Sequence, residues 1–240
     1  PPKCPLRASV FDRWHGPGYS SEKVFFESLP GFFVTGNLYR PASENRRRKE
    51  SPALLLAHGH WPDGRLHDHD PVYSNMASAI HLARLGFVVF AYDMVGYNDS
   101  CQLPHARWPG NTWAFAADPA WGLSLMSLQT WNSIRAVDFL ESLPDINASR
   151  IGITGTSGGG TQAFILSAVD ERIAASAPIS MVSLDMQGGC ACEGAPFLRI
   201  DASNVEIASR AAPKPLFLGG CTGDWTKTLM RREFPAIRAI

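Results

Sequence analysis

A glycine-rich run at 155–160, Gly-Thr-Ser-Gly-Gly-Gly, restricts this chain more than any other feature. The residues before it, 150–154, are rich in β-branched side chains and predict a short strand, whereas 161–169 predict a helix. A Gly-x-Ser-x-Gly pattern between a strand and a helix is typical of the nucleophile elbow, which exposes a serine hydroxyl at the end of a sheet. The turn is too tight for flanking side chains, which explains the glycines. We therefore predict that Ser157 is a catalytic nucleophile.

Other glycine-rich turns fit this run less well. A Walker A loop needs a lysine after its closing glycine, but Thr161 follows Gly160. A short-chain dehydrogenase would need a catalytic tyrosine downstream, and every tyrosine of the chain precedes Ser157. A strand-to-helix turn without chemistry remains the alternative.

Continuous apolar runs elsewhere predict strands that are buried on both faces. They occupy 53–57 and 87–91, and further strands are expected at 174–179 and 216–218. Strands that alternate with helices form a mostly parallel sheet with helices on both faces. We therefore predict a doubly wound α/β fold in a single domain over 1–240.

Three further segments complete the expected order. Helices are predicted over 74–85, ended by Gly86, and over 123–143, ended by Pro144. Residues 22–40 alternate around a turn at 29–31, so they predict an N-terminal antiparallel hairpin at the edge of the sheet.

Two long excursions, 94–120 and 181–212, interrupt this alternation. Open α/β sheets bind ligands at the carboxyl ends of their strands, so we expect both excursions to wall the pocket there. Aromatic rings near this end offer stacking faces for a substrate, although simple packing explains them equally well. The candidates are Trp61, Trp108, Trp113 and Trp225.

Two further positions fit a hydrolytic site. The strand at 53–57 runs into His58-Gly59-His60-Trp61, so the backbone amides of His60 and Gly158 are predicted to form the oxyanion hole. The acid of a triad follows the nucleophile in this order of elements, and Asp224 lies just beyond the strand at 216–218. The alternative for Asp224 is a capping role before a helix beginning at Thr226.

Histidines, aspartates and cysteines raise the question of a metal. The run 58–70 is rich in His and Asp but lacks the His-Glu-x-x-His pattern, so structural or oxyanion use is expected there. Cys190-Ala191-Cys192 is expected to be two unpaired loop thiols, with a local bridge or a soft metal pair as alternatives. We therefore predict no metal and no cofactor.

The composition bounds the partners. Lys plus Arg and Asp plus Glu both number 22, so the formal net charge is zero and nothing favours nucleic acid or an anionic membrane as partner. The basic run 46–49 lies between glutamates and predicts a solvated loop. No apolar stretch is long enough to span a membrane and no signal peptide is evident, so a soluble protein is expected. The sequence does not assign its cellular compartment.

The chain resembles the acetyl xylan esterase and dienelactone hydrolase-like branch of the α/β-hydrolase superfamily, especially bacterial members labelled acetyl xylan esterases. The matching runs lie at 25–31, 58–61, 92–100, 128–133, 155–160, 186–190 and 222–226. The resemblance implies an α/β-hydrolase fold and hydrolysis of small acyl esters such as acetyl, on a small molecule or a carbohydrate.

The resemblance also implies a catalytic histidine beyond Asp224. All seven histidines precede Ser157 and the sequence stops at Ile240, so we expect a missing C-terminal segment that carries the histidine and the last strand. The 240-residue chain is then expected to be nearly inactive and to self-associate through a bare sheet edge. The alternatives are a non-catalytic scaffold, a substitute base such as His60, or a peptidase of the prolyl oligopeptidase type.

Overall fold

A seven-stranded mixed sheet organises the computed structural model, which describes residues 1–43, 50–69, 73–105 and 124–240. The strand order is β1-β2-β3-β5-β4-β6-β7. β1, β2, β3 and β5 pair antiparallel, whereas β5, β4, β6 and β7 pair parallel. The sheet is therefore doubly wound with an antiparallel edge, as predicted.

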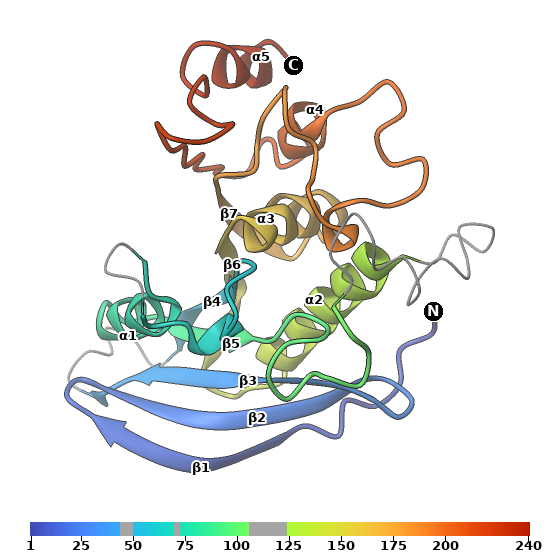
Figure 1. Ribbon diagram of the computed structural model, residues 1–240. Coiled ribbons are helices and arrows are strands. Elements are labelled where there is room, and N and C mark those ends of the chain that lie inside the picture. Colours follow the sequence, from blue (N-terminus) through green and yellow to red (C-terminus); the bar gives the residue numbers. More distant parts are fainter. Residues whose placement is uncertain (44–49, 70–72, 106–123) are drawn as a thin grey trace.

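The antiparallel edge contains one strand more than expected. The predicted hairpin is β2 (Tyr19–Leu29) and β3 (Phe32–Pro41), joined at Gly31, whose φ is +74°. β1 (Ser9–Gly16) pairs with β2 and forms the outer edge of the sheet in Figure 1. Most of its side chains are exposed, so it lacks the alternating apolar pattern that reveals a half-buried strand.

The parallel half places all its carboxyl ends at one edge. It consists of β4 (Ser51–Ala57), β5 (Val88–Tyr92), β6 (Ile146–Thr156) and β7 (Ile173–Ile179). Ala57 is in register with both Tyr92 and Gly155, and Thr156 is in register with Ile179. The loops that follow these strands consequently emerge side by side.

Helices cover both faces of the sheet (Figure 1). α1 (Asn75–Arg84), whose N-terminus is capped by the Ser74 hydroxyl, packs on a cluster that includes Leu56 and Val89. α2 (Leu125–Glu141) and α3 (Gly158–Val169) pack on the other face, against a cluster that includes Leu55 and Phe90. Successive residues of β4 and β5 therefore face opposite helix layers, because strand side chains alternate between faces. No helix in the described ranges is long and apolar enough to cross a bilayer.

The region after β7 departs from the prediction. Residues 216–218 were expected as a strand, but the segment 216–219 pairs with β7 through two isolated parallel bridges, Ser176 with Leu216 and Ile179 with Gly219, and forms no continuous strand. The expected helix at Thr226 is a series of turns, and the helix begins later, as α5 (Glu233–Ala239). A short α4 (Asn204–Ser209) lies within the second excursion and packs against α3 and α5.

Candidate active site

Ser157 lies at the sharp turn between β6 and α3. Its backbone φ is 58° and its ψ is −124°, a left-handed conformation that residues other than glycine rarely adopt. Its amide donates a hydrogen bond to Ile179 O (3.0 Å), and its carbonyl accepts one from Thr161 N (3.1 Å). The side chain of Ser157 does not cap α3. The predicted strand-turn-helix geometry is confirmed.

The glycines around Ser157 press directly on neighbouring strand ends. A Cβ atom on Gly159 would lie 2.0 Å from Ala57 O, and one on Gly155 would lie 2.5 Å from the same atom. A Cβ atom on Gly160 would lie 2.5 Å from Ile179 O. No side chain fits at these positions, so the backbone of the turn packs directly on the backbone at the ends of β4 and β7.

His58 begins the turn after β4 and has a structural role. Its Nε2 accepts a hydrogen bond from Met94 N (3.0 Å), which leaves Nδ1 to donate to Gly59 O (2.7 Å). The ring is fully buried, and this burial lowers the pKa of His58 to about 3. His58 is therefore a neutral imidazole whose two nitrogens are both used by the backbone, and it fixes the path of the next residues.

His60 lies directly against the serine turn. A Cβ atom on Gly158 would be 2.7 Å from Cε1 of the His60 ring, so the two segments predicted to supply the oxyanion hole are in contact. The helix that begins at Gly158 directs its N-terminal amides towards the same region, which favours negative charge there. The role of the His60 and Gly158 amides in binding an oxyanion remains a prediction.

Asp224 lies in a loop at the same end of the sheet. Its Oδ1 accepts hydrogen bonds from Thr226 N (2.7 Å) and Thr226 Oγ1 (2.5 Å), which is the capping alternative, although turns replace the expected helix. The next residue, Trp225, donates from Nε1 to Ser180 O (2.8 Å). Because Ser180 follows the carbonyl that binds the Ser157 amide, this loop is anchored beside the serine turn. Both bonds to Asp224 fall on one oxygen, so a second role as triad acid remains a prediction.

The four tryptophans predicted as stacking faces separate into three groups. Trp61 stacks on Tyr73 (ring centroids 4.4 Å apart) and on His67 (5.2 Å), so its ring is engaged in internal packing. Trp225 is 38% exposed and retains a solvent-facing surface. Trp108 and Trp113 fall in 106–123, outside the described residues.

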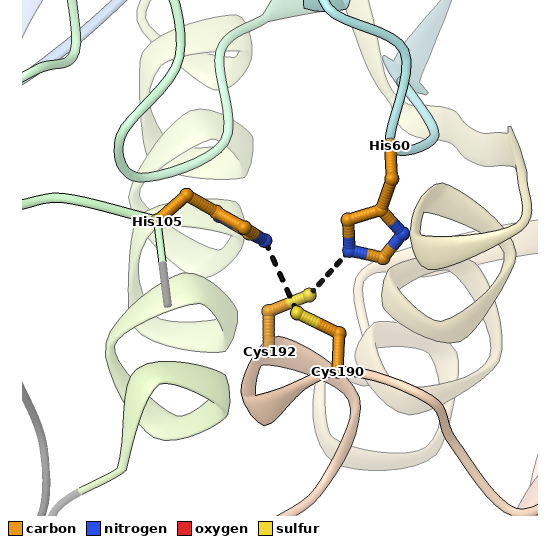
Figure 2. Close-up of side chains that lie close together, drawn as sticks. All are labelled: His60, His105, Cys190 and Cys192. Carbon is orange, nitrogen blue, oxygen red and sulfur yellow. Dashed lines mark hydrogen bonds between the residues drawn. The ribbon is translucent and has the colours of Figure 1, made fainter. Parts of the chain in front are cut away.

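Two cysteines and two histidines converge at one point, as Figure 2 shows, and the His60 ring among them contacts Gly158 of the serine turn. His60 Nε2 lies 3.1 Å from Cys192 Sγ, and His105 Nε2 lies 3.3 Å from Cys190 Sγ. All four candidate ligand atoms lie within 4.8 Å of one another, and this is the one such group among the residues the structure describes. None of the five cysteines forms a disulfide. The two excursions therefore meet each other and the turn after β4 at this point.

The two thiols have opposite acidities. A hydrogen bond with Cys192, followed by bonds with the two imidazoles, lowers the pKa of Cys190 far below its usual range. The neighbouring sulfur and burial raise the pKa of Cys192. The sequence predicted two unpaired loop thiols and missed their convergence with His60 and His105. The Cys-x-Cys spacing was the only local signal in the sequence, because both His60 and His105 are brought to the cysteines by the tertiary structure.

Comparisons with known proteins identify the family of the chain. A family model described as fungal glucuronyl esterase matches residues 76–204, just over half of the chain. The uncharacterized protein PA2218 of Pseudomonas aeruginosa is 28% identical over 162 residues, which is 68% of this chain and 37% of that protein. The chain spans less than half of the length of the curated relatives that it matches.

Solved structures share the fold. Methylesterase BT1017 superposes with a TM-score of 0.80 at 30% identity, covering 98% of this chain and 50% of that chain. The acetyl xylan esterase from Paenibacillus sp. R4 has a TM-score of 0.65 at 19% identity, covering 98% and 89%. The α/β-hydrolase fold and the esterase branch predicted from the sequence are confirmed.

Proposed function

Because the chain belongs to the glucuronyl esterase family, we propose that it is the nucleophile-bearing part of a serine esterase that cleaves carboxylic esters of carbohydrates. The observation that carries this proposal is the positive backbone φ of Ser157, 58°, at the junction of β6 and α3. A strained residue persists only where the surrounding structure holds it, and such residues cluster at functional sites. Here the glycine contacts with β4 and β7 hold it.

The proposed reaction is acyl transfer in two steps. Ser157 Oγ attacks the ester carbonyl carbon, and the carbonyl oxygen becomes an oxyanion that the amides of His60 and Gly158 bind. The carbon–oxygen bond to the alcohol then breaks, and the alcohol leaves with a proton. Water attacks the acyl-serine in the same way and releases the carboxylic acid.

A base must take the serine proton, because a hydroxyl is a weak nucleophile on its own. His58 is unsuited, since both its ring nitrogens are engaged by the backbone. The Nε2 atoms of His60 and His105 are engaged by the thiols of Cys192 and Cys190 (Figure 2). A histidine beyond Asp224, oriented by that carboxylate, therefore remains the proposed base.

The substrate class follows from the relatives' names. The matched proteins are named for esters of a sugar acid, methyl esters and acetyl groups on xylan. The feature common to these names is a carboxylic ester, and we assign to this chain an ester that is small on one side and carried by a carbohydrate, as in acetylated xylan. The exposed face of Trp225 supports a sugar ring next to the serine turn.

The experiment compares the natural full-length protein with its Ser157→Ala variant. Acetylated xylan, a methyl ester of glucuronic acid and 4-nitrophenyl acetate are supplied as substrates, and the release of acetate, methanol or nitrophenol is followed. Ser157→Ala should lower turnover by several powers of ten and leave the circular dichroism spectrum unchanged. Ser167→Ala, on the same helix with its hydroxyl bonded to Phe164 O, is the matched control and should keep full activity.

The outcome also separates the competing functions. Equal turnover by Ser157→Ala and the natural protein would refute Ser157 as nucleophile. A natural protein that hydrolyses no ester, and that is not labelled by a fluorophosphonate at Ser157, would support a non-catalytic scaffold. Cleavage of short peptides in place of esters would support a prolyl oligopeptidase-like activity.

A further inference from the structure

We propose that His60, His105, Cys190 and Cys192 form a binding site for a single zinc-class divalent metal ion. Their four ligand atoms lie within 4.8 Å of one another, although the residues come from three separate segments of the chain. His60 lies in the turn after β4, His105 in the first excursion, and the two cysteines in the second excursion (Figure 2). The ligands do not include Ser157 or Asp224, but His60 also supplies one of the amides proposed for the oxyanion hole, so the metal site lies next to the proposed active site.

The donor set matches zinc. Two cysteine sulfurs and two imidazole nitrogens are a common tetrahedral set for structural zinc, and soft thiolate ligands select against magnesium and calcium. In a tetrahedral site with these ligands, neighbouring donor atoms lie roughly 3.3–3.8 Å apart. The observed contacts from His60 to Cys192 (3.1 Å) and from His105 to Cys190 (3.3 Å) are already near that separation.

The His105 ring is oriented as a metal ligand requires. Its Nδ1 lies 2.7 Å from Val95 O, so Nδ1 carries the proton and donates it, and the lone pair of Nε2 faces the sulfurs. The backbone of this residue is also held, because a Cβ atom on Gly96 would lie 2.1 Å from His105 N. A histidine that binds a metal through one ring nitrogen usually donates the N–H of its other ring nitrogen to a carbonyl or carboxylate in this way.

His60 has the corresponding arrangement with a carboxylate. Its Nδ1 lies 3.8 Å from Glu193 Oε1, while its Nε2 faces Cys192. The Glu193 side chain is 2% exposed, and its other oxygen accepts a hydrogen bond from Gly189 N (2.6 Å). This buried carboxylate lies behind His60 but beyond hydrogen-bond distance, so it resembles the carboxylate–histidine–metal arrangement in position only.

Two metal-free explanations account for less of this geometry. Hydrogen bonds among the two thiols and two imidazoles account for the contacts, but they do not require two sulfurs and two ring nitrogens from three segments to meet at one point beside a 1%-exposed Cys192. A disulfide between Cys190 and Cys192 would leave both histidine lone pairs facing an oxidised sulfur, and both residues are thiols in the structure. A shared ion satisfies all four donors together.

Four protein ligands leave no open position, so the ion would be structural and should not act as a Lewis acid on substrate. It would join both excursions to the turn that contacts Gly158. Removal of the ion should therefore loosen these loops and lower the melting temperature.

The experiment measures metal content and cobalt spectra of the natural protein. Elemental analysis of protein purified under reducing conditions should find a single zinc ion per chain. After exchange with Co²⁺, the protein should show the intense d–d bands of tetrahedral cobalt and a thiolate-to-cobalt charge-transfer band. Cys190→Ser and Cys192→Ser should lose most of the charge-transfer intensity, and Cys101→Ser, an exposed cysteine outside the cluster, should keep it.

A folding failure of these variants does not prevent a decision. In that case the wild-type protein is treated with a chelator, and its cobalt bands should vanish and return when Co²⁺ is restored. The proposal is overturned if reduced wild-type protein binds neither zinc nor cobalt. It is also overturned if the Cys190→Ser, Cys192→Ser double variant folds and retains the charge-transfer band, or if mass analysis finds a Cys190–Cys192 disulfide in freshly prepared protein.

Discussion

The amide of Ser157 donates a hydrogen bond to the carbonyl oxygen of Ile179, 3.0 Å away. This bond ties the serine turn, at the end of β6, to the last residue of the neighbouring parallel strand β7. The next residue, Ser180, has a positive φ of 59° and binds the Trp225 indole through its carbonyl oxygen. The serine turn and the Asp224 loop are therefore positioned by one short piece of backbone.

Gly159→Ala should destabilise the protein, because the added methyl group would lie 2.0 Å from Ala57 O. The obstacle is backbone rather than a flexible side chain, so we expect a loss of about 3 kcal/mol or more in the free energy of unfolding. Gly223→Ala is the control, since no atom lies within 4 Å of its added Cβ. Urea denaturation of both variants measures the difference, and equal midpoints would refute the proposed seating of the turn.

Asp224→Asn distinguishes a catalytic carboxylate from a local cap. Its matched variant, Thr226→Val, removes the hydroxyl that bonds to Asp224 Oδ1 but leaves the carboxylate. If Asp224 orients the base, Asp224→Asn should lower kcat of the natural protein about 10⁴-fold. Thr226→Val should then cost about 1 kcal/mol of stability with little change in kcat. Similar kcat values for the two variants would assign Asp224 to capping alone.

Stability should depend on pH through Asp138. Burial acts to raise the pKa of this carboxyl, but bonds from Lys3 and Arg172 outweigh it and lower the pKa overall. A carboxyl with a depressed folded pKa stabilises the fold above its unfolded pKa, about 3.9, and loses this contribution as pH falls through the folded value. Asp138→Asn should therefore lower the unfolding midpoint at pH 7 more than at pH 3. Asp201→Asn, at an exposed position, is the control and should change neither midpoint.

The outer side of 216–219 should associate with another chain. Phe217 is 64% exposed in this stretch, and within the described ranges no strand pairs with that outer side. Unpaired backbone at a sheet edge favours pairing with a second copy. Sedimentation velocity should show concentration-dependent association that Phe217→Lys weakens. Phe197→Lys, at a residue that is 80% exposed in the second excursion, should not weaken it. A monomer at every concentration would contradict this prediction.

The strands in the interior of the fold were predicted well from the sequence, because parallel strands that are buried on both faces consist of continuous apolar runs. Leu55 and Phe90, which occupy such runs, lie in the predicted strands and in the main core. β1 was not predicted, because most of its side chains are exposed and show no such apolar pattern. The predicted helix at Thr226 is wrong, since the Thr226 hydroxyl bonds to both Asp224 and Cys221 N. Local side-chain bonds of this kind stabilise turns in competition with a helix.

The candidate site was predictable only in part, for a related reason. Ser157 was identified because its motif and both flanking elements are contiguous in the sequence. The cluster around Cys190 and Cys192 was not, because its two histidines come from other loops, and their distance from the cysteines depends on how the whole sheet is assembled. A local Cys-x-Cys pattern names two donors but cannot name their partners.

The backbone seating of the serine turn has a consequence for how substrate range can diverge in such chains. Gly155 and Gly159 fix the turn through contacts with the Ala57 carbonyl, which is a backbone atom of β4 and belongs to neither excursion. Changes in the two excursions can therefore accumulate without displacing the reacting atom. Substrate recognition by the excursions can then change while the catalytic chemistry at the serine turn is retained.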